Sequence, residues 1–157
     1  MLKKIRSRKP SGAGGHFAIV ASQYNSRYVD GMLRAAKAEL RRARAASIQV
    51  VRVPGAFEIP VVAARLARVA ARRPAAIICL GVILRGETSH AHHIGEAITH
   101  ALARVQIDTG VPVIHEVLLF ENEQQARVRC LGLRHNRGRE AAQTALAMAD
   151  VMRGLAD

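Results

Sequence analysis

A glycine, two hydroxyl residues and a histidine follow one another closely in the run from Leu84 to His90 (LRGETSH). Gly86 lets the backbone turn sharply and approach a ligand, and Thr88 and Ser89 stand where a helix would begin. The free N–H groups of such a helix start, with hydroxyls beside them, are typical of a phosphate-binding turn. An ordinary helix cap is the other interpretation, and this stretch alone leaves both open.

His90 would lie in the first turn of that helix. An imidazole there can accept and return a proton near neutral pH, which suits a general base beside a phosphate ester. A surface histidine without a role is the alternative, because His92 and His93 adjoin it. A metal site is a third interpretation, since His90 and His93 could share a helix face with His100. No acidic or thiol ligand at a suitable spacing completes such a site, so we expect no metal.

Short apolar runs alternate with segments of helical periodicity, and this alternation predicts the elements that position these residues. Strands are expected at residues 16–22, 47–53, 75–84 and 112–119, and helices at 26–44, 57–71, 89–108, 123–129 and 139–155. Ser26 is expected to cap the first helix. Consecutive β–α units form parallel sheets through right-handed crossovers.

The predicted fold class is therefore α/β: a single-domain three-layer α/β/α sandwich, with a flavodoxin-like four-stranded parallel sheet and helices on both faces. This domain is expected over residues 16–157. Residues 1–15 are expected to form a flexible basic tail, because five of the first ten residues are basic and a Gly-rich stretch follows.

Ligands of such sheets bind beyond the carboxyl ends of the strands, so the loops there should converge on one ligand. Tyr24 and Asn25 follow the first strand, and Ala56, Phe57 and Glu58 follow the second. Since Tyr24 and Phe57 are two of only five aromatic residues, a planar ligand could stack on one of them. A hydrophobic plug is the alternative for Phe57, and a favourable partner of the helix dipole is the alternative for Glu58.

The formal net charge of +12 raises the possibility of nucleic-acid binding. No recognised nucleic-acid motif accompanies the charge, and aromatic residues, at 3%, are too few for a stacking platform. We therefore expect a basic surface that attracts anionic metabolites rather than nucleic acid. Arg129 and Arg137 flank a break near the C-terminus, and each could supply a guanidinium that grips a phosphate.

Cys79 and Cys130 do not form a CxxC pair, and we interpret them as reduced thiols. No apolar run approaches the ~18 residues of a membrane span, and the basic N-terminus lacks the apolar stretch of a secretory signal. We therefore expect a cytoplasmic protein without membrane contact.

Several longer runs occur together and in a characteristic order: residues 53–60 (VPGAFEIP), 81–90 (GVILRGETSH) and 136–142 (NRGREAA), with 109–113 (TGVPV) and 123–126 (EQQA) in support. In these runs the chain resembles the lumazine synthase family of riboflavin biosynthesis, and the resemblance covers nearly the whole chain from Phe17 onward. It implies a condensation without a cofactor. A ribitylaminouracil reacts with 3,4-dihydroxy-2-butanone 4-phosphate through a Schiff base, phosphate elimination and ring closure.

The resemblance also implies roles for individual residues. Tyr24 takes the position of the aromatic residue that stacks on the pyrimidine, Glu58 would accept hydrogen bonds from ribityl hydroxyls, and His90 would shuttle protons. The ribityl pocket would be lined by Ala56, Phe57 and Glu58. The pyrimidine edge would be held by Val82, Ile83 and Leu84. The phosphate would be bound by Gly86, Glu87 and Thr88. Arg129 would bind the phosphate from a neighbouring subunit, because the family builds its sites between adjacent members of a pentamer.

This sequence departs from the family pattern at several positions. Ala91-His92 follows the histidine where the family usually has an aromatic–acidic pair. His115 stands where an aromatic residue usually covers the heterocycle, and its smaller ring can still stack on the substrate. Arg137 replaces the usual lysine, and Glu116 a glycine. The changes at Ala91-His92 and His115 motivate a second hypothesis, a paralogue that binds a pyrimidine or flavin with little turnover. A third hypothesis is a nucleic-acid-binding protein that depends on its first ten residues.

Overall fold

A computed structural model of the chain describes residues 14–156. They form a four-stranded parallel sheet in the order β2-β1-β3-β4. The strands are β1 (His16–Ser22), β2 (Ser47–Val53), β3 (Ala76–Leu84) and β4 (Val113–Phe120). β3 lies between β1 and β4, and its apolar sequence is explained by burial on both of its faces.

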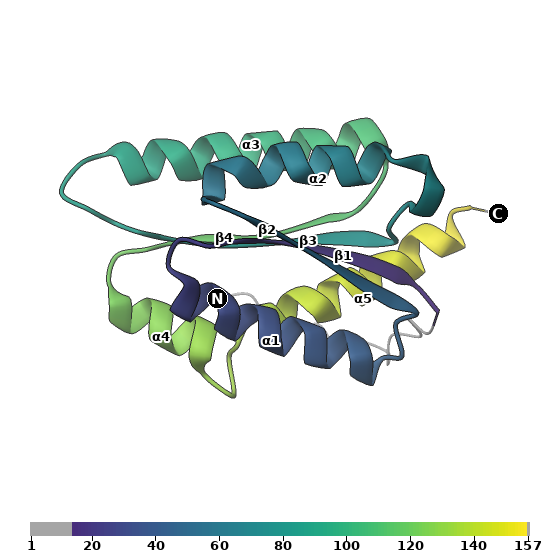
Figure 1. Cartoon of the computed structure of the whole chain (residues 1–157), viewed down its shortest axis with the longest axis horizontal. Coiled ribbons are helices and arrows are strands. Elements are labelled where there is room, and N and C mark those ends of the chain that lie inside the picture. Colours follow the sequence, from purple (N-terminus) through teal and green to yellow (C-terminus); the bar gives the residue numbers. More distant parts are fainter. Residues whose placement is uncertain (1–13, 157) are drawn as a thin grey trace.

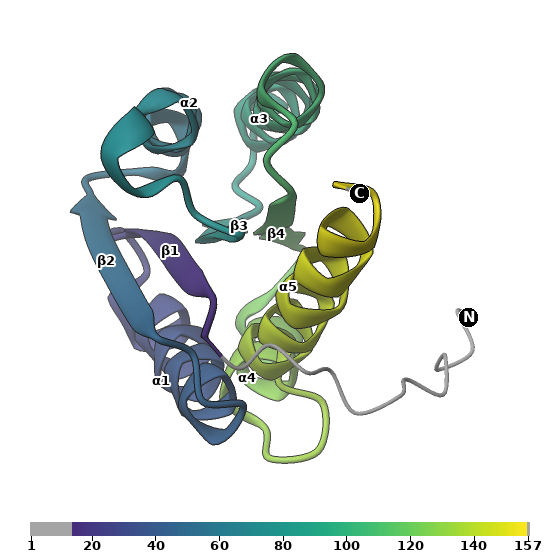
Figure 2. The ribbon, with the colours of Figure 1, turned by 90° about the vertical axis from the view of Figure 1, so that its right-hand side faces the viewer.

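Helices cover both faces of this sheet (Figure 1, Figure 2). One face carries α2 (Ile59–Arg68) and α3 (His90–Thr109), and the other carries α1 (Ser26–Arg42), α4 (Glu123–Leu131) and α5 (Arg137–Gly154). Two 3-10 turns, η1 (Ala56–Glu58) and η2 (Ala70–Arg72), flank α2. The predicted fold class, a parallel sheet with helices on both faces, is confirmed.

The starts of three helices differ from the prediction. Ser26 was expected to cap α1, but Asn25 occupies that position with a left-handed backbone (φ 56°). The single helix expected over residues 57–71 is divided into η1, α2 and η2. α5 begins at Arg137 rather than at residue 139, because Asn136 Oδ1 accepts hydrogen bonds from the first free N–H groups of the helix.

α1 and α5 cross at close range on the far face of the sheet from α2 and α3. A Cβ on Gly138 would collide with the carbonyl oxygen of Met32, so only glycine fits this crossing. Gly31 is also confined, since a Cβ there would lie 2.7 Å from the carbonyl oxygen of Cys130 in α4. The close approach at Gly138 fixes the start of α5, and with it Arg137, against α1.

β4 is an edge strand, and side chains occupy two of its main-chain N–H groups. Val113 N donates to Gln106 Oε1 of α3 (2.8 Å), and Val117 N donates to His115 Nδ1 (3.1 Å). Both groups point away from β3, because the alternate residues Pro112 and Phe120 turn their carbonyls toward it. This edge is therefore partly satisfied by the chain itself.

No helix within residues 14–156 is long and apolar enough to cross a membrane. Of the tail expected at residues 1–15, residues 1–13 lie outside the described part of the chain. The extent of the tail and of the domain remains a prediction.

Candidate active site at the carboxyl edge of the sheet

The loops that follow the four strands meet at one edge of the sheet. Gln23 N and Tyr24 N, after β1, donate to the carbonyl oxygen of Pro54, after β2 (3.1 and 3.0 Å). Arg85 N, after β3, donates to the carbonyl oxygen of Phe120 at the end of β4 (2.9 Å). The convergence expected from the order of elements is therefore present.

Asn25 connects the β1 loop to the end of β3. Its Nδ2 donates to the carbonyl oxygen of Val82 (2.8 Å), which explains why its side chain leaves the helix that it precedes. β1 pairs with β3 only as far as Leu80, whereas β4 pairs with β3 as far as Leu84. Val82, Ile83 and Leu84 therefore have a strand on one side only. On the open side the carbonyl of Val82 already accepts from Asn25, and the main-chain groups of Leu84 can pair with the polar edge of a planar ligand.

Tyr24 and Glu58 meet over Gly55. Gly55 N donates to Glu58 Oε2 (2.9 Å). A Cβ on Gly55 would lie 2.8 Å from Glu58 Oε2 and 3.0 Å from Tyr24 Cδ2. The absence of a side chain thus lets an aromatic ring and a carboxylate approach each other. One carboxylate oxygen accepts from the main chain of Gly55, and within residues 14–156 the other has no hydrogen-bond partner.

Phe57 and Tyr24 expose their rings. Their exposed fractions are 62% and 71%, which is high for aromatic side chains. Ala56 lies behind them, close enough that a Cβ on Gly81 would contact it at 3.5 Å. The hydrophobic-plug interpretation of Phe57 is therefore not supported within this chain, and both rings are available to a ligand or to a second chain.

The turn between β3 and α3 borders a hollow of about 340 Å³. Its lining consists of Arg85, Glu87, Thr88, Ser89, His92, Leu119 and Glu121. Arg85 Nη1 lies 2.7 Å from Glu121 Oε2, so an ion pair joins the ends of β3 and β4 beside the hollow. His90 is the first residue of α3 and is exposed, whereas His92 is the histidine that lines the hollow.

His115 lies in the middle of β4, with its ring directed toward α3. Because Val117 N donates to Nδ1, the ring proton is on Nε2, which donates to Thr99 Oγ1 (2.8 Å). The Thr99 hydroxyl in turn donates to the carbonyl oxygen of Gly95 (2.8 Å). Burial lowers the pKa of His115, in agreement with this neutral form. Both ring nitrogens are thus engaged, and stacking of the ring on a heterocycle remains a prediction.

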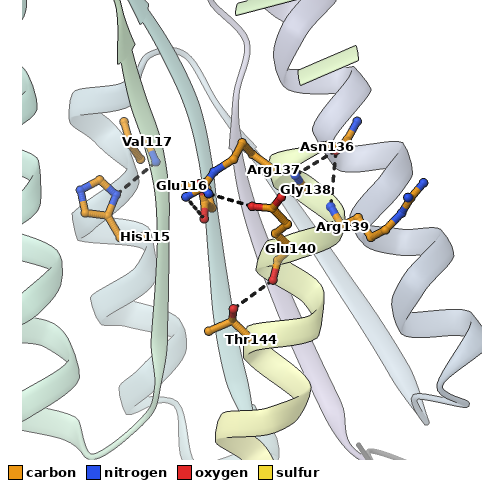
Figure 3. A network of polar contacts seen from close by, with 9 residues as sticks. All are labelled: His115, Glu116, Val117, Asn136, Arg137, Gly138, Arg139, Glu140 and Thr144. Carbon is orange, nitrogen blue, oxygen red and sulfur yellow. Dashed lines mark hydrogen bonds and ion pairs between the residues drawn. The ribbon is translucent and has the colours of Figure 1, made fainter. Parts of the chain in front are cut away.

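On the opposite side of β4, Glu116 is held by Arg137 (Figure 3). Arg137 Nε and Nη2 donate to the two carboxylate oxygens of Glu116, and Nη1 donates to Glu140 Oε2 (2.7 Å). All three guanidinium nitrogens are therefore engaged. Arg137 does not line the hollow, so the geometry does not support the phosphate-binding role predicted for it.

The remaining predicted residues fall in two groups. Gly86, Glu87 and Thr88 lie in the exposed turn before α3, and Arg129 is exposed on α4. The sequence analysis did not single out Arg85 and Glu121, which line the hollow. The position of Arg85 directly before Gly86 could have indicated that it lies at this turn. The described residues contain no group of three or more His, Cys, Asp or Glu side chains that could hold a metal ion, so His90, His93 and His100 form no such site.

A larger hollow, of about 770 Å³, lies at the opposite edge of the sheet, where β1, β3 and β4 begin. It contains none of the predicted site residues. We therefore assign the chemistry to the carboxyl edge, where polar and aromatic groups from several loops converge.

Comparisons with known proteins show the family of the chain. Residues 14–153 match the family model described as 6,7-dimethyl-8-ribityllumazine synthase. A protein of that name from Stenotrophomonas maltophilia (strain R551-3) is 43% identical over 150 residues, which cover 94% of each chain. Another, from Kineococcus radiotolerans, is 40% identical over 147 residues, covering 92% of this chain and 89% of the relative. A third, from Xanthomonas campestris pv. campestris (strain B100), is 40% identical over 138 residues.

Proposed function

This chain belongs to the 6,7-dimethyl-8-ribityllumazine synthase family and has its transferase activity in riboflavin biosynthesis, and we propose that its active site lies at the carboxyl edge of the sheet. The observation that carries this proposal is the meeting of four loops there, with Tyr24, Phe57 and Glu58 on one side and a hydroxyl-lined hollow on the other. The two sides suit the two parts of the reaction, a planar polar heterocycle and a phosphate ester.

On this proposal the substrates are 5-amino-6-(D-ribitylamino)uracil and 3,4-dihydroxy-2-butanone 4-phosphate. The amine attacks the carbonyl carbon and water is lost to give a Schiff base. Phosphate then leaves, and ring closure with loss of water gives 6,7-dimethyl-8-ribityllumazine. Each step moves protons between neighbouring atoms, so a positioned acid–base group contributes more than a cofactor would.

The heterocycle and its side chain are assigned to the first two loops and the end of β3. Tyr24 supplies the stacking ring, and the exposed oxygen of Glu58 accepts hydrogen bonds from ribityl hydroxyls. Val82, Ile83 and Leu84 are assigned to the pyrimidine edge, because they form the end of β3 that β1 does not pair. Asn25 contributes by keeping the β1 loop against Val82.

The phosphate is assigned to Gly86, Glu87 and Thr88, because the free N–H groups at the start of α3 and the hydroxyl beside them favour an anion. His90 transfers protons from the first position of that helix.

Arg129 is assigned to the phosphate of a neighbouring subunit within a pentamer. Its exposure, together with the exposed rings of Tyr24 and Phe57, supports a site that a second chain completes. A cytoplasmic location is part of the same proposal, and the two buried, unpaired cysteines, Cys79 and Cys130, agree with it.

The test is to mix the two substrates with the purified protein and follow the lumazine chromophore. His90→Ala should slow its formation by about 10²-fold or more, because general acid–base groups contribute about that much. His100→Ala, an exposed histidine on the same helix, is the control and should leave the rate unchanged. A wild-type protein that forms no lumazine would show that the assigned reaction is wrong.

A weakly active binding paralogue is the second candidate. It is favoured by Ala91-His92, which leaves no carboxylate directly after His90, and by the engaged ring of His115. This candidate predicts tight binding of a pyrimidine or flavin with little turnover, and recovery of turnover in Ala91→Tyr/His92→Asp. Turnover in the wild type that saturates with both substrates excludes it.

A further inference from the structure

The hollow beside the β3–α3 turn has an unusual charge distribution for a phosphate site. Two carboxylates, of Glu87 and Glu121, line it, and Arg85 supplies the one permanently positive side chain among its lining residues. A dianionic phosphate that enters such a space is repelled by both carboxylates unless a cation compensates them. Arg85 is therefore the group whose position decides whether the hollow accepts an anion.

Arg85 is anchored by its main chain and free at its tip. Arg85 N donates to the carbonyl oxygen of Phe120 (2.9 Å), which fixes the root of the side chain where β3 and β4 end. Its guanidinium touches Glu121 through Nη1 alone and is 61% exposed. Arg137 is the contrast, because all three of its guanidinium nitrogens are engaged by carboxylates. In the described part of the chain, Arg85 Nε and Nη2 remain available as donors.

Glu121 is a weak competitor for this guanidinium. Its carboxylate is 55% exposed, and exposed ion pairs contribute little because water solvates both partners. A phosphate ester carries more charge than a carboxylate and offers several acceptor oxygens to the planar donors of arginine. Exchange of Glu121 for a phosphate therefore favours the phosphate.

We propose that Arg85 is a further phosphate-binding residue of this site, and that Glu121 holds its guanidinium at the mouth of the hollow until the phosphate replaces it. This inference rests on the proposed function, since it concerns the phosphate-bearing substrate. It also gives Glu121 a role. Between turnovers Glu121 pairs with the guanidinium of Arg85, and this pairing lowers the affinity of Arg85 for the substrate phosphate.

The test is a comparison of steady-state constants for four full-length proteins: the wild type, Arg85→Gln, Glu121→Gln and Arg104→Gln. Arg104 forms an exposed ion pair with Asp108 on α3 and is the matched control (2.8 Å). Arg85→Gln should raise KM for the butanone phosphate tenfold or more and leave KM for the aminouracil within twofold. Glu121→Gln should lower KM for the butanone phosphate, and Arg104→Gln should change neither constant.

Inorganic phosphate serves as a probe that does not depend on turnover. Its inhibition constant should rise in Arg85→Gln and fall in Glu121→Gln, and Arg85→Lys should recover part of the loss, because it keeps the charge without the planar fork. An unchanged KM and an unchanged inhibition constant in Arg85→Gln would overturn the inference while the wild type still forms lumazine. A wild type that forms no lumazine contradicts the proposed function instead, so the two failures are distinguishable.

Discussion

The guanidinium of Arg137 lies side-on against the carboxylate of Glu116, with both Nε–Oε2 and Nη2–Oε1 at 3.0 Å. Glu116 is only 6% exposed, so this pair joins the middle of β4 to the start of α5 largely out of water. Burial raises the pKa of Glu116 to about 7, although Arg137 acts in the opposite direction. The pair therefore contributes to stability only while both partners are present.

Removal of Arg137 alone should be strongly destabilising. Arg137→Met leaves the carboxylate of Glu116 buried without a cation, and we expect a loss of about 3 kcal/mol at pH 8. The double variant Glu116→Leu/Arg137→Met removes both charges and should recover most of that loss. Urea denaturation of the two variants and the wild type measures both values. Equal losses in the single and double variants would contradict this account.

The stability of the protein should depend on pH through Glu116. Its pKa in the folded state is above the ordinary value of 4.5, so the folded state holds a proton that the unfolded state releases. The resulting stabilisation is complete below about pH 4.5 and is lost as the pH rises through about 7. The difference in unfolding free energy between the wild type and Glu116→Gln should therefore fall over this window. A constant difference from pH 4.5 to 7.5 would show that Glu116 titrates normally.

Thr99 should matter to stability because of His115. Thr99→Val keeps the shape of the side chain but removes the acceptor of the His115 Nε2–H, at a cost of about 0.5–1 kcal/mol. Thr144→Val is the matched control, since Thr144 also donates to a carbonyl four residues earlier, that of Glu140, and is exposed. The midpoint of thermal unfolding should fall more in Thr99→Val than in Thr144→Val. Similar decreases in both variants would contradict the proposed role of the His115 hydrogen bond.

Gly138 should be the least replaceable glycine of the helices. Gly138→Ala sets a methyl group against the carbonyl of Met32 and must separate α1 from α5, so we expect a loss of more than about 2 kcal/mol. Gly95→Ala in α3 meets no atom within 4 Å and should stabilise by about 0.5–1 kcal/mol. In denaturation experiments the free energy of unfolding should decrease in Gly138→Ala and increase in Gly95→Ala.

Tyr24 should affect one substrate and not the other. Tyr24→Leu removes the exposed ring, and KM for the aminouracil should rise about tenfold, the equivalent of about 1.4 kcal/mol. KM for the butanone phosphate serves as the internal control, because its assigned contacts lie in another loop. Parallel changes in both constants would instead indicate that the loop itself had moved.

Most of the fold could be predicted from the sequence, because its elements follow from local patterns. The apolar run that became β3 and the glycine that ends α3 are examples, since each depends on neighbouring residues only. Asn25 could not be predicted as the residue before α1. Its left-handed backbone accompanies a hydrogen bond to Val82, 57 residues further along the chain. Such distant partners leave no local trace.

The sequence was sufficient to predict which loops form the site, but not which side chains contact one another there. The alternation of strands and helices was enough to bring Tyr24 and Phe57 to the edge that holds Thr88. The prediction for Arg137 considered its own surroundings in the sequence, whereas its guanidinium contacts Glu116 on a strand 21 residues earlier. The sequence does not show whether the guanidinium of an arginine is already bound by carboxylates or is free to bind a ligand. For this reason the sequence analysis did not single out Arg85.

The two occupied N–H groups of β4 also limit how folded copies can associate. Growth of an open fibre by sheet extension needs two receptive edges on every molecule, one to give and one to accept. A strand that approached β4 would first have to displace Gln106 from Val113 and His115 from Val117. Strand addition is thereby directed to β2. Two molecules that pair through their β2 strands form a closed dimer, and no further molecule can be added to its sheet. Edge-to-edge pairing of folded copies through β4 is in this way hindered.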